Sequence, residues 1–320
     1  MLLRPSDTSS AKVVPLPDPA DGAGLLSRVF SPVGEKDSWG RIASGQAFLI
    51  SRAAPNFYTN FFRIAALDEF LAMRPPHFSR LSLHSAKGEI SRALYTKADD
   101  RVDYRQIAQL LETGASIILS QMQEMIADLA DLCRESEALF ERRCQANIYW
   151  SPPDAQCLPE HADDHDVIIL QLAGTKKWTL RADFEVIDGN TGQGEPAQVE
   201  EFILEAGDLL YCPRGIVHRA RTLGGSSLHV SLGIEGIPWR AVVKKVLEDI
   251  FASTPVMNDY IPLAGSSDAA FEVALNGLRV SLVQQLGDRS RLINVLEDLR
   301  SELPSKRLGQ PLRPSSLFSK

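Results

Sequence analysis

Residues 161–166 have the sequence HADDHD, which places two histidines and three aspartates within six positions. If this stretch is a β-strand, alternate side chains share one face, because successive residues of a strand point to opposite sides. His161, Asp163 and His165 would then face the same cation, and the other three residues would face away. An H-x-D pair supplies two ligands of a 2-His-1-carboxylate site, which leaves positions open on iron(II) for oxygen chemistry. A solvated acidic turn with incidental histidines explains the local stretch equally well.

A second pattern lies downstream, where residues 207–218 have the sequence GDLLYCPRGIVH. It has the form G-x5-P-x-G-x2-H. Its histidine, His218, is separated from Asp163 by 54 residues. The first glycine permits a tight turn, and Pro213 fixes the approach of the chain. Gly215 lets the backbone bend so that His218 returns inward. We therefore predict that His218 is the third ligand rather than a core or surface histidine after a turn.

The bulk composition is that of a globular protein. The chain has 320 residues, of which 44% are hydrophobic and 23% charged, and this length accommodates one large domain and a smaller one. It contains no apolar run of roughly 18 residues, so no membrane association is expected. The net charge of −7 argues against direct nucleic-acid binding, which depends on clustered cations. None of the four cysteines forms a C-x-x-C pair, and we expect reduced thiols in a cytoplasmic protein.

The chain changes character twice along its length. Residues 1–24 form a loose Pro-, Asp- and Ser-rich arm, and 25–238 are expected to form the main domain. Helical periodicity is predicted at 64–74, 103–114 and 122–143, with strand-like stretches at 44–53 and 115–120. Short β-rich runs fill 144–235 and favour an antiparallel sandwich or barrel. Helices are predicted at 239–251, 268–286 with Asp268 as N-cap, and 290–303, before a frayed tail at 304–320.

The H-x-D pair followed by the G-x5-P-x-G-x2-H histidine resembles the cupin-type JmjC oxygenases, and more narrowly their ribosomal-oxygenase branch. The resemblance runs from about residue 25 to 240 and is strongest from Asn147 to His218. It implies a mostly β core, a double-stranded β-helix (jelly roll) with helical flanks and a C-terminal helical region. It also implies that His161, Asp163 and His218 bind iron(II), with 2-oxoglutarate as cosubstrate and dioxygen as oxidant.

The segment "NIYWSPPDAQCLPEHADDHDVIILQLAGTKKWTL" is similar to further family features. By this resemblance Lys176, fifteen residues after His161, holds the distal carboxylate of 2-oxoglutarate. A cation at the far end of a dry pocket orients such a dianion as well as attracting it. Strand parity puts Lys176 on one face with Trp178, while Lys177 faces away. Asn147 and Tyr149 share a face of the preceding strand, and their family counterparts hydrogen-bond the cosubstrate.

The remaining histidines are expected to have other roles. We expect His165 to lie behind the ligands or to face the substrate, since the family usually has a hydrophobic or aromatic residue there. His229 and Ser231 share a face of a later strand and are candidates to line the pocket, although structural packing explains both. His77 and His84 fit no ligand spacing and are expected to be structural or exposed. Cys212 is expected to be a small buried hydrophobe.

The resemblance implies an enzyme that hydroxylates an amino-acid side chain of a protein or peptide, of the ribosomal-protein Arg/His type. The C-terminal part departs from the family, which usually adds a winged-helix domain after a dimerising helical region. About eighty residues follow Pro238, and they read as helices, so a homodimer through these helices is the expected assembly. Three alternatives stay open: a hydroxylase of a free amino acid or small peptide, a non-catalytic metal-binding cupin, and a lysine demethylase.

Overall fold

The computed structural model describes residues 24–60, 62, 64–73, 79–182, 184–188, 194–197, 201–253, 260–261 and 267–303. The chain divides into two compact units, Met1–Glu235 and Gly236–Lys320. This division lies close to the boundary predicted after Pro238. It does not test the predicted domain limits, which stay a prediction. The arm and the tail fall almost wholly outside the described residues. Among the described helices, none is both long and apolar enough to cross a membrane.

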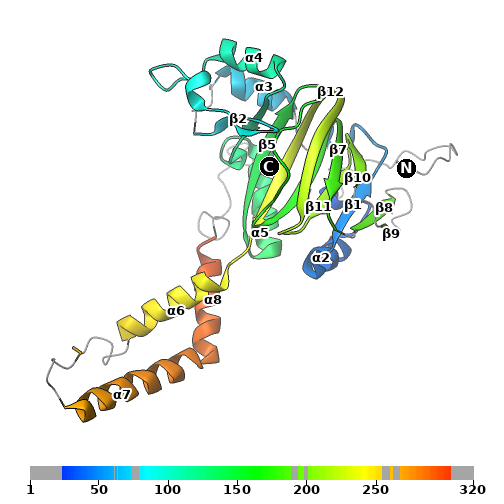
Figure 1. Ribbon diagram of the computed structural model, residues 1–320. Coiled ribbons are helices and arrows are strands. Elements are labelled where there is room, and N and C mark those ends of the chain that lie inside the picture. Colours follow the sequence, from blue (N-terminus) through cyan, green and yellow to red (C-terminus); the bar gives the residue numbers. More distant parts are fainter. Residues whose placement is uncertain are drawn as a thin grey trace, which may run out of the picture. The chain divides into compact units, whose positions relative to one another are not determined.

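The first unit is built on a sheet of twelve strands (Figure 1). Its main path runs β3-β2-β4-β5-β12-β7-β11-β1-β8-β9, with β10 added to β7 and β6 added to β12. The strands β1 and β8 are parallel, and the other pairs are antiparallel. The strand bounds are β1 Ala47–Ser51, β2 Leu81–Ser85, β3 Gly88–Glu89, β4 Ser116–Leu119, β5 Arg143–Ser151, β6 His161–Ala162, β7 Asp166–Leu180, β8 Phe184–Asp188, β9 Gly194–Ala197, β10 Glu201–Glu205, β11 Leu209–Cys212 and β12 Val217–Glu235.

Two long strands take part in both layers of this sheet. The first half of β7 pairs with β11, and its second half pairs with β10. The second half of β12 pairs with β5, and its first half pairs with β6. Gly174 lies at the bend of β7 with a φ of +69°, and a Cβ there would stand 2.1 Å from the carbonyl oxygen of Ser226. Only glycine fits this position, where β7 passes close to the backbone of β12 at an irregularity in their pairing.

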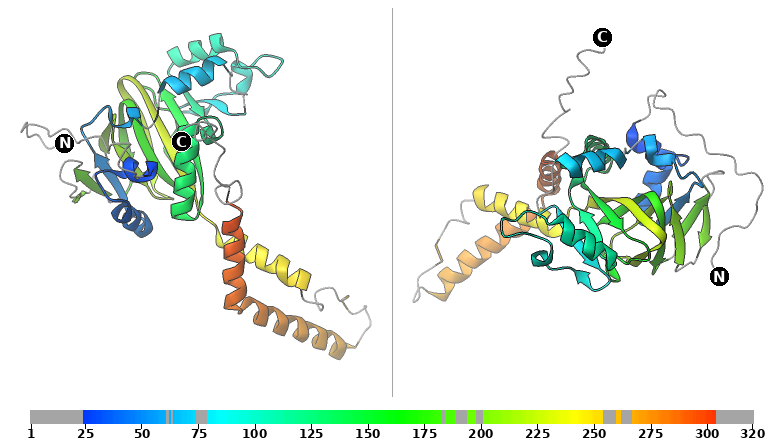
Figure 2. Two further views of the ribbon diagram at one scale, coloured as in Figure 1. Left: turned by 180° about the vertical axis from the view of Figure 1, so that it is seen from behind. Right: turned by 90° about the horizontal axis from the view of Figure 1, so that it is seen from above.

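Helices cover one face of the sheet and leave a second core between the layers. The helices and 3-10 turns of this unit are α1 Leu25–Phe30, α2 Glu35–Ser44, η2 Phe57–Asn60, α3 Ile64–Met73, η3 Arg92–Leu94, α4 Tyr104–Glu112, η4 Met122–Glu124 and α5 Ala127–Phe140. The larger apolar cluster joins α1 and α5 to β5, β7 and β12, and α5 lies against the sheet in the view from behind (Figure 2). The smaller cluster includes Val167, Ile169, Trp178 and Leu180 and lies beside the pocket described below.

The predicted helix at 122–143 is shorter and begins later than its periodicity indicates. Gln121, directly before the predicted range, has a left-handed φ of +57°, and its N–H donates to Asn147 Oδ1 at 3.0 Å. The single turn η4 follows, and α5 begins only at Ala127. The helix ends where Glu141 adopts a left-handed φ of +48°. Ile126 has extended backbone directly before α5, so the predicted helix is broken inside its range, next to the contact of Gln121 with β5.

The second unit contains three helices in its described part, α6 Trp239–Ser253, α7 Asp268–Leu286 and α8 Arg289–Ser301. Its small core joins Val242, Val246, Ile250 and Val295. The helices agree with those predicted from periodicity, but the N-cap assigned to Asp268 was wrong. Ser267 has the extended backbone of a cap, and its hydroxyl accepts from the N–H of Ala270 at 3.3 Å. Asp268 is instead the first residue of the helix.

Candidate metal centre

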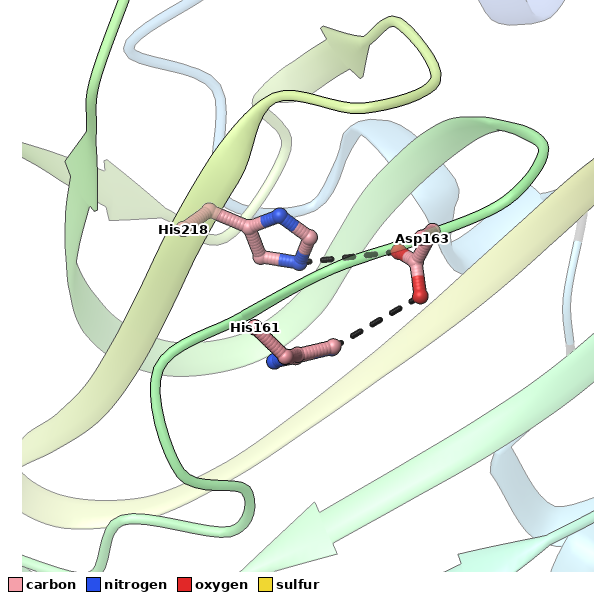
Figure 3. Close-up of side chains that lie close together, drawn as sticks. All are labelled: His161, Asp163 and His218. Atoms are coloured by element: carbon pink, nitrogen blue, oxygen red, sulfur yellow. Dashed lines mark ion pairs between the residues drawn. The ribbon is translucent and has the colours of Figure 1, made fainter.

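Strand pairing brings the two candidate histidine ligands together. His161 in β6 lies directly opposite His218 in β12, and their ring centroids are 4.5 Å apart. Asp163 follows the end of β6 and turns its carboxylate toward both rings (Figure 3). The predicted trio therefore converges on one point from two distant stretches of the chain.

The spacing of the three side chains fits a metal ion. His161 Nε2 lies 3.6 Å from Asp163 Oδ1, and His218 Nε2 lies 3.6 Å from Asp163 Oδ2. All three candidate ligand atoms lie within 4.8 Å of one another. Ligand atoms about 2.1 Å from a metal and at right angles to each other would be about 3 Å apart. A small closure of these side chains would therefore complete one face of an octahedron.

Both imidazoles present the correct nitrogen to this point. His161 Nδ1 lies 2.9 Å from the carbonyl oxygen of Pro159, and His218 Nδ1 lies 3.0 Å from that of Ile216. A carbonyl oxygen only accepts, so each Nδ1 carries the proton and each Nε2 keeps its lone pair. Burial lowers the pKa of His218 below its ordinary value, which favours this neutral form. The donor set, its tautomers and its spacing thus agree with a 2-His-1-carboxylate metal site.

The strand-parity argument for this motif was wrong, although His161 and Asp163 do converge with His218. The strand β6 ends at Ala162, and residues 163–165 form a bend before β7 begins at Asp166. Asp163 reaches the histidines from this bend rather than from a shared strand face. His165 does not line the pocket; its Nδ1 contacts Asp164 Oδ1 at 2.9 Å, and its ring lies over Gly233. A role for His165 in substrate contact stays a prediction.

Lys176 lies in the same pocket as the three candidate ligands. The pocket encloses about 460 Å³ of space that is partly open to solvent. Thirteen described residues line it, namely Tyr149, Cys157, Leu158, His161, Asp163, Val167, Ile169, Lys176, Trp178, His218, Ala220, His229 and Ser231. As strand parity predicts, Lys176 and Trp178 both face the pocket, whereas Lys177 faces away and pairs with Glu201 at 2.6 Å.

Lys176 is a buried cation without a carboxylate partner in the described part of the chain. It is 2% exposed, and its ammonium group donates to Ser151 Oγ at 3.2 Å. Burial lowers the pKa of Lys176 to about 8, because the apolar surroundings disfavour the charged form. Directly across the strand pair, the hydroxyl of Thr222 is buried without a hydrogen-bond partner among the described residues. Buried polar or charged groups without a partner lower the stability of a fold unless a ligand binds to them.

Three aromatic rings form a wall of the pocket. Tyr149 stacks on His229 with ring centroids 4.7 Å apart, and Trp178 meets His229 edge-on at 6.1 Å. Burial and the nearby Lys176 lower the pKa of His229 well below its ordinary value, so this imidazole is neutral. His229 Nδ1 and Trp178 Nε1 are both buried without a hydrogen-bond partner in the described residues. The wall thus offers polar edges as well as flat apolar surface.

The other candidate residues lie as follows. Tyr149, His229 and Ser231 line the pocket, but Asn147 does not, because its side chain turns to the backbone of Gln121. Asn147 nevertheless lies opposite Ser231 in the strand register. The free Cys212 is buried, as expected, with its sulfur 3.8 Å from His218 Nδ1.

Two histidines of the N-terminal half lie elsewhere. His84 lies in β2 outside the pocket, where Ser82 Oγ is 2.9 Å from its Nε2. His77 lies outside the described residues.

Sequence reasoning missed two kinds of pocket residue. Ala220 could have been found from its parity with His218, whereas no sequence signal points to Cys157 or Leu158.

The JmjC domain family matches residues 119–242, which include the whole pocket. The convergence of His161, Asp163 and His218 thus occurs inside the segment that matches the JmjC domain family. Its strands β5, β7 and β12 supply most of the pocket, and the candidate ligand His161 lies on the short strand β6 between them.

The curated relatives that this chain matches are larger proteins. A bifunctional lysine-specific demethylase and histidyl-hydroxylase NO66 from Aedes aegypti is 31% identical over 195 residues, which is 58% of this chain and 31% of the relative. The protein of the same name from Dictyostelium discoideum is 30% identical over 236 residues, 70% of this chain and 45% of the relative. The chain thus spans less than half the length of these curated relatives.

Solved structures share the fold of the JmjC domain with its flanks. The ribosomal oxygenase YcfD from Escherichia coli aligns with a TM-score of 0.55 and 19% identity, over 85% of this chain and 73% of that one. A structure of YcfD in complex with cobalt and 2-oxoglutarate aligns with a TM-score of 0.55 and 18% identity, over 88% and 76%. The predicted double-stranded β-helix with helical flanks and C-terminal helices is confirmed.

Proposed function

We propose that the chain is an iron(II)- and 2-oxoglutarate-dependent oxygenase that hydroxylates an amino-acid side chain of a protein or peptide. The observation that carries this proposal is the pairing of two sites in one pocket. A convergent His161, Asp163 and His218 trio lies at one place, and the buried cation Lys176, which has no carboxylate partner among the described residues, lies at another. A metal ligand set alone would suit many proteins, but a buried ammonium group with no acidic partner calls for an anionic ligand.

Each pocket residue has a task in this reaction. His161, Asp163 and His218 would hold iron(II) on one face through two neutral imidazoles and a carboxylate. Lys176 would bind the distal carboxylate of 2-oxoglutarate, with Ser151 orienting its ammonium group. Tyr149, Trp178 and His229 would exclude water from the carbon skeleton between the two ends. When bound, iron(II) supplies the chemistry by which 2-oxoglutarate and dioxygen become succinate and CO2 while a C–H bond becomes an alcohol.

The names of relatives support a side chain of a protein as the substrate. The curated relatives are described as histidyl-hydroxylases and demethylases, and the structural neighbour as a ribosomal oxygenase. Hydroxylation of Arg or His in a ribosomal protein is therefore the substrate class we favour. A free amino acid or small peptide is the second candidate, and N-methyl-lysine demethylation uses the same pocket chemistry.

A non-catalytic metal-binding protein is the alternative from another class. It would need the three ligands but not a place for a dianion. Lys176 argues against it, because burying an unpaired ammonium group destabilises a fold that never binds an anion. The two readings differ in one measurable property, the turnover of 2-oxoglutarate.

Anaerobic reconstitution tests the proposed function. The protein is loaded with iron(II) and 2-oxoglutarate, the weak visible charge-transfer band is recorded, and succinate is measured after oxygen is admitted. We expect the band and substrate-independent slow succinate formation from the wild-type chain, and neither from His161→Ala. Metal binding without either signal would support the non-catalytic alternative. Mass spectrometry of cell extract for a hydroxylated peptide would then identify the substrate.

We also propose a homodimer through the C-terminal helices and a cytoplasmic location. The dimer is supported by apolar side chains that α7 leaves exposed, among them Val273, Val280 and Val283. The location is supported by four free, buried cysteines, which need no oxidising compartment. Direct nucleic-acid binding is not part of the proposal, because the chain carries a net charge of −7.

A further inference from the structure

Asp166 lies three residues after the candidate ligand Asp163, but it does not belong to the converging trio. Its backbone opens β7 and lies opposite Ile234 of β12, so the residue is anchored in the sheet. Its carboxylate oxygen Oδ1 accepts from the backbone N–H of Arg214 at 2.7 Å. Hydrogen bonds to a carboxylate are among the stronger ones in proteins, because the acceptor is charged.

The N–H group of Arg214, which donates to Asp166, belongs to the turn that leads into His218. This turn, residues 213–216, is closed by a hydrogen bond from the N–H of Ile216 to the carbonyl oxygen of Pro213 at 3.3 Å. Gly215 adopts a φ of +84° within it. The carbonyl oxygen of Ile216 in turn accepts from His218 Nδ1 at 3.0 Å and so sets the direction of the ring.

The same turn also holds the backbone of the ligand loop. The N–H of Gly215 donates to the carbonyl oxygen of Asp163 at 2.9 Å. Two adjacent N–H groups of one turn therefore bind the two aspartates at either end of the bend 163–166, one through a main-chain oxygen and one through a side chain. Displacement of the turn would move Asp163 and His218 relative to each other.

We propose that Asp166 is a positioning residue of the metal centre, whose carboxylate fixes the turn 213–216 and thereby the separation of Asp163 and His218. This inference rests on the proposed metal site and adds a residue to it. Loss of a residue that orients metal ligands typically weakens metal affinity by roughly 10- to 100-fold.

Glu160 makes a second link between the segments that carry the candidate ligands, but this link is weaker. Glu160, before His161, contacts Arg181 at 2.9 Å and Arg219, after His218, at 4.0 Å. The two arginines are about half exposed, and exposed ion pairs contribute little because water screens them. The Asp166 bond is shorter and is made to a backbone N–H of the turn itself, so it is the stronger support.

Cobalt(II) titration of the metal-free full-length chain tests the proposal. Dissociation constants and d–d absorption spectra are compared for the wild type, Asp166→Ala, Asp166→Asn and the control Asp164→Ala. Asp164 is the matched control because its side chain is 93% exposed and contacts His165 instead of the turn. We expect Asp166→Ala to weaken binding by about 10- to 100-fold and to change the spectrum. Asp166→Asn keeps an acceptor oxygen and should stay within about threefold of the wild type.

The outcomes separate this inference from the site itself. Wild-type affinity and spectrum in Asp166→Ala overturn it, and so does an Asp166→Asn variant that falls as far as the alanine, since charge and not the hydrogen bond would then matter. Melting curves in EDTA show whether Asp166→Ala folds; if it does not, Asp166→Asn decides, because a loss of affinity of about tenfold or more overturns the inference and retention within about threefold supports it. A wild type that binds no cobalt(II) would instead overturn the proposed metal centre.

Discussion

Lys176 donates a hydrogen bond to Ser151 across 3.2 Å, and no carboxylate accompanies this buried ammonium group in the part of the chain that the structure describes. Ser151 is itself completely buried, at the end of the strand that carries Tyr149. The pair is therefore incomplete as a structural element, because one hydroxyl cannot replace the hydration that the cation has lost. We therefore expect this buried ammonium group to bind an anion, which would replace the hydration that it has lost.

Replacement of Lys176 by methionine should separate cosubstrate binding from stability. Methionine has a similar volume and carries no charge, so Lys176→Met should abolish 2-oxoglutarate binding and leave cobalt(II) binding intact. Without the buried cation, the free energy of unfolding of the ligand-free protein at pH 7 should rise by about 1–3 kcal/mol. Calorimetric titration and denaturant unfolding measure the two effects. Lys177→Met is the control, because Lys177 faces away and pairs with Glu201; equal effects in both variants would contradict the assignment.

The affinity for 2-oxoglutarate should fall as the pH rises above about 8. Burial lowers the pKa of Lys176 to about 8 in the folded chain, against an ordinary value of 10.5. Below pH 8 the side chain of Lys176 is protonated, and the affinity for 2-oxoglutarate should not depend on pH. Above pH 8 the affinity should drop by up to about tenfold per pH unit. Titrations of the manganese(II)-loaded protein from acidic to basic pH measure this. Lys176→Arg should bind independently of pH, because a guanidinium stays charged.

The same shift has a consequence for stability. The folded pKa of Lys176 lies below the unfolded one, so the unfolded chain binds the proton more readily. The stability cost of the buried charge is fully present below pH 8 and disappears as the pH rises from 8 toward 10.5. The free energy of unfolding of Lys176→Met should therefore exceed that of the wild type most at neutral pH.

The site could be predicted from the sequence where a motif or strand alternation carries the information. The motif ending at His218 and the resemblance to the JmjC oxygenases, which implies His161 and Asp163 as its partners, predicted the converging trio, and alternation along one strand separated Lys176 from Lys177. These predictions needed no knowledge of where the chain bends. Alternation failed for His165, because the strand ends at Ala162 and a bend carries Asp163 to the metal position.

Other features depend on contacts between distant segments. Asn147 shares a strand face with Tyr149, yet its side chain accepts from the backbone N–H of Gln121, directly before the predicted helix. Asp166 contacts Arg214, which lies 48 positions away in the chain. Neither contact leaves a local pattern, because each joins segments that only the pairing of the strands brings together.

Trp178 should report metal binding by its fluorescence. Its ring centroid lies 5.8 Å from that of His218, and the indole is 5% exposed. Cobalt(II) in the proposed site should quench this indole strongly, because such quenching falls steeply with distance. Trp178→Phe should lose most of the quenching, whereas Trp39→Phe should keep it, since Trp39 packs on Phe140 away from the pocket. Unchanged quenching in Trp178→Phe would place the metal elsewhere.

Charges on the exposed face of α7 should dissociate the proposed dimer. Val273 and Val280 lie two helical turns apart and are 74% and 53% exposed, an unusual position for two valines. The double variant Val273→Glu, Val280→Glu should sediment as a monomer where the wild type sediments as a dimer. Gln284→Glu, on the same helix, controls for added charge alone. A monomeric wild type would contradict the proposed assembly.

Gly233 and His165 should be energetically coupled. A Cβ at Gly233 would stand 2.9 Å from the ring atoms Cδ2 and Nε2 of His165, so Gly233→Ala should push the ring aside. We expect this overpacking to lower the free energy of unfolding by about 1–3 kcal/mol. His165→Ala removes the obstacle, and the double variant should recover part of the loss, with a coupling of about 0.5–3 kcal/mol in a urea-unfolding cycle. Cobalt(II) affinity should stay unchanged in His165→Ala, because its imidazole is not one of the converging ligands. Additive effects on stability would show that the ring moves freely, and lost metal binding would make His165 a ligand.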